Sequence, residues 1–168
     1  MAYRNKTYVC FDGDTDMSYY RLMQAWHQND RSAFSFYNAH ELNTARDTSQ
    51  EESIKRQLRE RLLSTKVFVV LIGANTRYLI KFVKWEMEQA LALRLPIIGV
   101  NLNGLRQQDP ERCPPTIRHE LAVHVSFNPA VMQHALENWP SSAESLRQQG
   151  KTGPYYYQQS VYQQLGLA

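Results

Sequence analysis

Several features that define protein classes are scarce in this chain. It has only two cysteines, Cys10 and Cys113, in 168 residues, so neither a disulfide framework nor a thiolate metal site is expected. Lysine and arginine are dispersed among aspartate and glutamate without long runs of one sign, and the net charge is +3, which does not indicate nucleic-acid binding. No apolar stretch approaches the length of a membrane span.

The remaining bulk properties are those of an ordinary globular protein. Hydrophobic residues make up 43% and charged residues 21% of the chain, and 168 residues suffice for one domain with a buried core. The N-terminal residues Met-Ala-Tyr-Arg-Asn-Lys run directly into a strand-like segment and do not resemble a signal peptide. We therefore expect a cytoplasmic protein with no membrane partner and no metal.

Strand-like and helix-like segments alternate along most of the chain, which favours an α/β fold with a parallel sheet covered on both faces. The segment 67–72 is continuously apolar, as a central parallel strand should be. The other strand-like segments are 7–11, 34–37, 97–100 and 122–126.

Helical periodicity is clearest in the first half of the chain. A helix that starts near Asp16 or Ser18 should bury one stripe, made of Tyr19, Leu22, Met23 and Trp26. Residues 49–52, Ser-Gln-Glu-Glu, form a capping box that should open a second helix with Ile54, Leu58 and Leu62 directed inward.

The second half is less regular. Glycine and proline mark 101–115 as a long connection, 116–121 suggest a short helix, and 130–137 suggest another. From Trp139 the composition changes, and Tyr155, Tyr156 and Tyr157 with Val161, Tyr162 and Leu165 suggest a terminal helix. We expect one domain over 1–138 and an extension over 139–168 that packs on it.

The helix that follows segment 67–72 carries an anomalous carboxylate. At 100° per residue, Glu86 lies within a broad apolar arc, whereas Lys81, Lys84 and Glu88 lie on the other side. The members of the arc are Leu79, Phe82, Val83, Met87, Ala90, Leu91 and Leu93. Because an unpaired buried charge costs several kcal/mol, we expect Glu86 to be partnered or to face a cavity. Glu86 is the leading candidate for a catalytic residue.

A second acidic feature is the turn Asp12-Gly-Asp-Thr-Asp16. It fails as a calcium loop, because Met17 and Met23 replace the glycine and glutamate that such a loop needs. Asp12 and Asp14 after an apolar strand are closer to the opening motif of haloacid dehalogenase phosphatases, although the later acidic pair of that family is missing. The structural interpretation is that Asp14 and Asp16 form a turn and cap a helix.

Carboxyl ends of parallel strands are the usual ligand-binding edge of an open α/β sheet. The acidic turn, the loop 38–49, the segment 73–76 and the first turns of the Glu86 helix should meet there. Arg46 in the loop is a candidate phosphate ligand.

The order of these features resembles a TIR domain, in particular the bacterial TIR-like branch that includes the TIR-like subunit of the Thoeris antiphage system. The matching segments are 8–12, 48–55, 64–76 and 82–99, within residues 6–128. TIR enzymes carry a catalytic glutamate in a Trp-x-x-x-Glu motif. Glu86 matches that glutamate, Phe82 replaces the tryptophan, and Trp85 lies next to the acid.

The resemblance implies a flavodoxin-like, doubly wound five-stranded parallel sheet in the order 2-1-3-4-5. It also implies cleavage of the nicotinamide glycosidic bond of NAD as substrate, without a cofactor, and a loop over 38–49 that gates the site. Self-association and a separate effector reached through a nucleotide signal are the implied partners.

The available residues suit this chemistry. Nicotinamide leaves as a neutral group from a cationic linkage, so the main requirement is to stabilise a positively charged sugar, which Glu86 can do. Candidate binding residues are Asp12, Asp14 and Thr76 for the ribose or phosphates, Arg46 for the pyrophosphate, and Phe82 and Trp85 for the nicotinamide or ribose. The alternatives are a noncatalytic TIR-like interaction module and, less favoured, a phosphatase that uses Asp12 and Asp14.

Overall fold

The computed structural model describes residues 6–28, 35–37 and 51–168. Its elements are β1 (Lys6–Cys10), α1 (Met17–Gln28), β2 (Ser35–Tyr37), α3 (Glu51–Leu63), β3 (Val67–Ile72), the 3-10 helix η2 (Thr76–Tyr78), α4 (Val83–Ala92), β4 (Ile97–Asn101), β5 (Ala122–Ser126), α5 (Pro129–Gln148), β6 (Pro154–Tyr156) and α6 (Gln159–Gln164). The predicted capping box begins at Ser49 and so lies partly outside the described residues.

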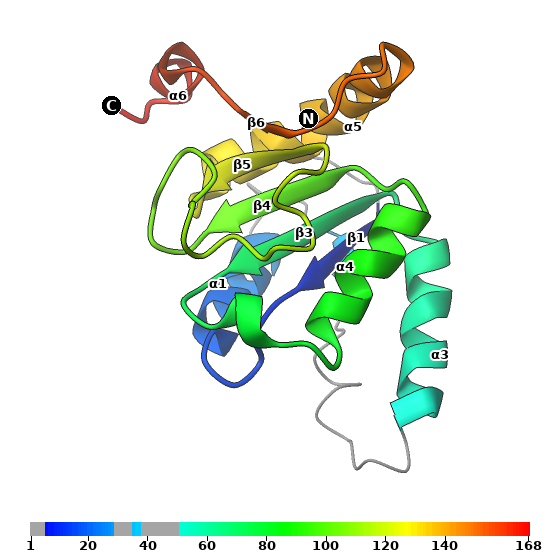
Figure 1. The fold of residues 1–168 in the computed structure, drawn as a ribbon. Coiled ribbons are helices and arrows are strands. Elements are labelled where there is room, and N and C mark those ends of the chain that lie inside the picture. The colour runs from blue at the N-terminus through cyan, green and yellow to red at the C-terminus, as the bar shows by residue number, and fades with distance from the viewer. Residues whose placement is uncertain (1–5, 29–34, 38–50) are drawn as a thin grey trace.

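The strands form one six-stranded sheet in the order β2-β1-β3-β4-β5-β6, and every pair of neighbours is parallel. The α/β class is therefore confirmed, and the first five strands follow the expected order. The expected number of five strands is wrong, because β6 pairs with β5 and extends the sheet. Figure 1 shows the sheet as a twisted layer between helices.

The sheet has a separate hydrophobic core on each face, because alternate residues of a strand point to opposite sides. In β3 all six residues are buried. Val67, Val69 and Leu71 join the core that α1, α5 and α6 cover, whereas Phe68, Val70 and Ile72 join the core beneath α3 and α4. This double coverage explains why 67–72 has no polar residue.

The helix predictions hold best where apolar spacing is regular. Ile54, Leu58 and Leu62 of α3 are buried as predicted. In α1, Met23 is buried, but the prediction for Leu22 is wrong: this side chain is 45% exposed, and Tyr20 takes the buried position. Tyr20 stacks on Phe11 with ring centroids 4.5 Å apart, so the aromatic pair fixes which side of α1 faces the sheet.

The predicted end of the fifth helix at Glu137 is wrong, since α5 continues to Gln148 through Pro140. Trp139 and Ala143 continue the buried stripe at helical spacing, and their burial outweighs the polar composition of this stretch. The junction between residues 138 and 139 therefore lies inside a helix.

The C-terminal segment also differs from the prediction. Tyr155 and Tyr156, expected in a terminal helix, lie in β6, and only Gln159–Gln164 are helical. Tyr162 of α6 is fully buried in the core on the α1 and α5 face. Arg106 lies over its ring at 4.2 Å and donates a hydrogen bond to the backbone carbonyl of Ala168, which attaches the end of the chain to the connection after β4.

The connection between β4 and β5 covers part of the sheet without a helix. The short helix predicted over 116–121 is wrong, because 114–120 form successive turns. Asn101 holds the connection by donating from Nδ2 to the carbonyls of Leu105 and Gln107, at 3.0 and 2.7 Å. Cys113 and Ile117 of the connection are fully buried in the core beneath α4.

A histidine is buried at the sheet beneath this connection. His124 of β5 is 0% exposed and pairs with Gly99 of β4. A Cβ atom at position 99 would lie 2.7 Å from His124 Nδ1, so glycine provides the space for the imidazole. Neither ring nitrogen has a hydrogen-bond partner among the described residues, and burial lowers the pKa of His124 to about 4.

None of the helices in the described part of the chain combines the length and the hydropathy that crossing a bilayer requires.

The buried imidazole predicts acid sensitivity. The unfolded chain binds this proton with an ordinary histidine pKa near 6.5, whereas folded His124 binds it only near pH 4. The free energy of unfolding should therefore fall by about 3 kcal/mol as the pH drops from about 6.5 towards 4. Urea denaturation at a series of pH values measures this slope.

The comparison variants are His124→Leu, which should lose this part of the slope, and His119→Gln in the exposed part of the connection, which should retain it. An equal pH dependence of the free energy of unfolding in the wild type and His124→Leu would contradict the lowered pKa of His124.

Candidate active site

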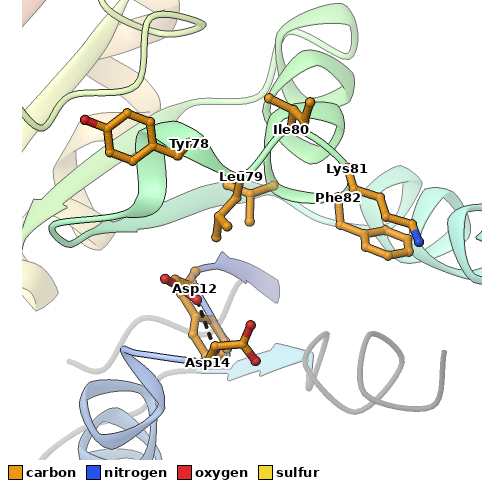
Figure 2. A pocket seen from close by; sticks show the side chains of 10 residues that line it. Asp12, Asp14, Tyr78, Leu79, Ile80, Lys81 and Phe82 are labelled. Carbon is orange, nitrogen blue, oxygen red and sulfur yellow. Dashed lines mark hydrogen bonds between the residues drawn. The ribbon is translucent and has the colours of Figure 1, made fainter. Parts of the chain in front are cut away.

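A cavity of about 270 Å³ opens at the carboxyl end of β1. Its two walls are the turn after β1 and the segment that joins η2 to α4, which face each other in Figure 2. The residues that line it are Phe11, Asp12, Gly13, Asp14, Tyr78, Leu79, Ile80, Lys81, Phe82 and Val83. The structure therefore brings the acidic turn and the start of the Glu86 helix together, as the sequence predicted.

Asp12 organises the turn. Its Oδ1 accepts hydrogen bonds from the backbone N–H groups of Asp14 and Thr15, at 3.0 and 3.4 Å, and its Oδ2 accepts one from the Thr15 hydroxyl at 2.6 Å. Asp12 is 3% exposed, whereas Asp14 is exposed at the cavity. Both oxygens of Asp12 thus serve the turn, and Asp14 is the exposed carboxylate of the cavity lining.

Asp16 closes the turn against the neighbouring strand. Its carbonyl accepts from the N–H groups of Tyr19 and Tyr20, so α1 begins directly after it. Its carboxylate is buried and packs on Gly73, where a Cβ atom would lie 2.3 Å from Oδ2. Burial, followed by the nearby charge of Asp12, raises the pKa of Asp16.

Thr76 has a local structural role. Its hydroxyl accepts a hydrogen bond from the Gly73 N–H at 2.9 Å and donates to the carbonyl of Leu71 at 3.3 Å. The side chain is 1% exposed and does not line the cavity. Thr76 therefore fixes the exit from β3, and we assign it no contact with a ligand.

Glu86 lies on the buried side of α4, as the helical periodicity predicted. Its neighbours on that side, Val83, Met87 and Ala90, are buried, and Glu86 itself is 2% exposed. Its Oε2 accepts a hydrogen bond of 2.6 Å from the hydroxyl of Tyr8 on β1. The carboxylate is thus partnered, which is one of the two outcomes that a buried charge requires.

Glu86 is not among the residues that line the cavity. It lies one helical turn beyond Phe82 and Val83, which do line it, and its N–H donates to the carbonyl of Phe82 at 2.7 Å. One turn of α-helix corresponds to a rise of about 5.4 Å. The carboxylate is therefore not on the cavity surface, and its residue follows the cavity lining by one turn of α4.

The other predicted site residues are placed differently. Phe82 lines the cavity, with Lys81 beside it in Figure 2. Trp85 does not: the cations of Lys55 and Arg59 on α3 each lie 5.5 Å from its ring centroid, so it packs between the two helices. Arg46 lies outside the described residues.

Sequence reasoning missed the exposed residues on one wall of the cavity, which are Tyr78, Ile80 and Lys81. Tyr78 and Ile80 are 65% and 73% exposed, which is unusual for large apolar side chains. The guanidinium of Arg77 lies 5.1 Å from the Tyr78 ring centroid, and Arg77 also donates to the carbonyl of Glu111. Lys81 forms an ion pair with Glu51 at 3.4 Å. The position of 78–81 just after a buried strand was the signal that could have indicated them.

Comparison with known families agrees with this arrangement. The family model described as "Thoeris protein ThsB, TIR-like domain" matches residues 8–107, which is more than half of the chain. The chain belongs to the ThsB TIR-like family. No curated protein matches its sequence. The ThsB TIR-like match contains Tyr8, both cavity walls and Glu86, whereas β5, α5, β6 and α6 follow its last residue.

Among the described residues of this ThsB TIR-like protein, no group of three or more histidine, cysteine, aspartate or glutamate side chains has the arrangement to hold a metal ion. The acidic turn illustrates why, since Asp12 directs its oxygens to the backbone and the hydroxyl of its own turn.

The contact between Asp16 and Gly73 predicts the effect of one added methyl group. Gly73→Ala should lower the free energy of unfolding by roughly 1–3 kcal/mol, because the new Cβ overlaps the Asp16 carboxylate. The double variant Gly73→Ala/Asp16→Ala should recover most of this loss, since the overlap is then absent. Urea denaturation of both single variants and the double variant gives the interaction free energy between positions 16 and 73. Strictly additive effects would contradict the contact.

Proposed function

We propose that this ThsB TIR-like protein cleaves NAD at the bond between nicotinamide and ribose and that the ADP-ribose-derived product is a signal in antiphage defence. Glu86 carries the proposal, because it is a buried carboxylate on the apolar side of α4, one turn along the helix from the cavity lining. Membership of the ThsB TIR-like family supports the same reaction class.

The reaction suits a site with one well-placed carboxylate. The nicotinamide of NAD is bonded to ribose through a positively charged ring nitrogen, so it leaves as a neutral molecule and needs no general acid. The bond electrons go to that nitrogen, and the ribose develops positive charge in the transition state. A fixed negative charge in a low-dielectric environment stabilises that state more than the ground state.

Glu86 would supply this charge. The cavity residues nearest to it along α4 are Phe82 and Val83, which precede it by one turn. In this proposal the cavity binds the substrate beside these two residues, and the buried carboxylate stabilises the sugar through its charge, without direct contact.

The cavity offers groups for different parts of the substrate. Phe82 and Tyr78 offer aromatic rings, exposed Asp14 offers a carboxylate for ribose hydroxyls, and Lys81 offers a cation for the pyrophosphate. Ligand pockets usually measure about 300–1,000 Å³. At about 270 Å³ the cavity holds a part of the dinucleotide, and the rest lies outside it.

The acceptor decides the product. Attack by water on the same ribose carbon gives ADP-ribose, whereas attack by an adenine nitrogen gives a cyclic ADP-ribose, and in both cases one proton is released to solvent. Either product diffuses, and we propose that it acts on a separate effector in the cytoplasm.

A noncatalytic role as an interaction module is the second candidate. The observation in its favour is the pair Tyr78 and Ile80, exposed large apolar residues at the rim of the cavity. A phosphatase is not proposed, because Asp12 directs both carboxylate oxygens to its own turn.

Replacement of Glu86 tests the proposed reaction. Glu86→Gln keeps the size of the side chain but removes its charge, so nicotinamide release from NAD should fall by at least about 100-fold. The matched control is Glu88→Gln on the exposed side of α4, which should retain activity. Chromatography of nicotinamide after incubation of concentrated protein with NAD measures both.

Two results would overturn the enzymatic role. Absence of nicotinamide release from the wild type, also in extract of phage-infected cells, favours the interaction module. Equal loss in Glu86→Gln and Glu88→Gln indicates a general effect on α4 and not a specific role of the charge.

Replacement of Tyr78 tests substrate binding without a large effect on folding. Because the side chain is 65% exposed, Tyr78→Ala should leave the free energy of unfolding nearly unchanged. Loss of the aromatic wall should raise the KM for NAD roughly two- to tenfold, as expected for a contact of about 0.5–1.5 kcal/mol. The control is Tyr156→Ala on β6, another exposed tyrosine, which should leave the KM unchanged. An unchanged KM in Tyr78→Ala would place the substrate elsewhere.

A further inference from the structure

We infer that Tyr8 is a positioning residue for Glu86: its hydroxyl fixes the direction of the carboxylate and keeps it in the charged form that the reaction needs. This inference rests on the proposed function and adds a specific residue to it. Tyr8 is separated from Glu86 by 78 positions in the sequence and does not line the cavity.

The geometry of the pair is specific. The Tyr8 hydroxyl donates to Glu86 Oε2 at 2.6 Å, which is within the range of short hydrogen bonds from a hydroxyl to a carboxylate. Tyr8 is 0% exposed and Glu86 is 2% exposed, so bulk water does not compete for either group. In such surroundings a charge-assisted hydrogen bond has a larger effect than at the surface.

The donor is held by the sheet. Tyr8 pairs with Tyr37 on one side and with Phe68 on the other, which places it inside the sheet and not at an edge. Its ring stacks on Phe68 with centroids 5.5 Å apart and planes 14° apart. The backbone and the ring are therefore both fixed, and the hydroxyl has a defined position relative to α4.

The donor also remains protonated. Burial, followed by the negative charge of Glu86, raises the pKa of Tyr8 well above its ordinary value. The same two causes raise the pKa of the Cys10 thiol, which lies on the same side of β1 and approaches the carbonyl of Val83. Of these neutral neighbours, Tyr8 is the one that donates to the carboxylate.

A purely structural role for Tyr8 makes a different prediction. If the ring only fills the core, Tyr8→Phe preserves its function, because the ring and its stacking on Phe68 remain. If the hydroxyl positions Glu86, the same variant affects the chemical step and its pH dependence. Without the Tyr8 hydroxyl the carboxylate loses one hydrogen bond to its charged form, so it takes up a proton more readily and is held less firmly in one rotamer.

The first experiment compares Tyr8→Phe with the wild type in nicotinamide release from NAD. The kcat should fall roughly 10- to 100-fold with little change in KM. The acid limb of the pH-rate profile should move to higher pH, because one hydrogen bond to the charged form is lost. The matched control is Tyr162→Phe, which removes the hydroxyl of another fully buried tyrosine and should leave kcat and the profile unchanged.

The second experiment does not depend on activity. Carbon NMR of protein labelled at the glutamate carboxyl carbon follows the titration of Glu86, with its signal identified by absence in Glu86→Gln. The titration midpoint should move to higher pH in Tyr8→Phe and stay unchanged in Tyr162→Phe.

The outcomes separate the inference from the proposed function. If the wild type is active, Glu86→Gln is inactive and Tyr8→Phe has the wild-type kcat and pH profile, the inference is overturned and the proposed function stands. If the wild type releases no nicotinamide, the proposed function is overturned and the NMR titration alone decides. In that case an unchanged titration midpoint in Tyr8→Phe overturns the inference. A shifted midpoint supports the part of it that says the Tyr8 hydroxyl keeps Glu86 charged.

Discussion

The burial of one carboxylate constrains the arrangement of strand β1 and helix α4. Glu86 is enclosed on the apolar side of α4, and a charge in such a place is tolerated only when hydrogen bonds replace its lost water. The Tyr8 hydroxyl meets part of that requirement from the middle of the sheet. Rotation of α4 by one residue would move Glu86 away from this donor and expose apolar side chains. The polar contact therefore fixes the same helix orientation that hydrophobic packing favours.

The two faces of the sheet are covered in different ways. On one face α1, α5 and α6 form an apolar layer. On the other face α3 and α4 lie side by side, and the irregular connection after β4 covers the rest (Figure 1). Buried polar groups gather beneath that connection, including Asn101 and His124. The connection brings backbone carbonyls that a helix would not offer, and Asn101 donates to two of them, so a polar side chain that an entirely apolar core would exclude is tolerated here.

Local periodicity predicted the parts of the fold that depend on local information. The burial of 67–72 and the orientation of Glu86 follow from alternation and helical spacing, and both are confirmed. Long-range contacts were beyond such reasoning. Nothing in the residues around Tyr8 indicates that its hydroxyl reaches Glu86, and nothing near Tyr155 indicates that this segment pairs with β5. The hydrogen bonds of Thr76 were equally beyond such reasoning, since this polar residue at the carboxyl edge of the sheet holds the turn after β3.

The last strand has a consequence for the behaviour of the molecule in concentrated solution. An uncovered strand presents unpaired N–H and C=O groups that can template pairing with another chain. β6 occupies that side of β5 with only three residues, Pro154–Tyr156, and begins with a proline that cannot donate to a neighbour. The sheet thus ends in a short edge strand that offers few groups for pairing with another chain. Loss of the C-terminal segment would expose the edge of the buried strand β5, and this new edge would promote aggregation.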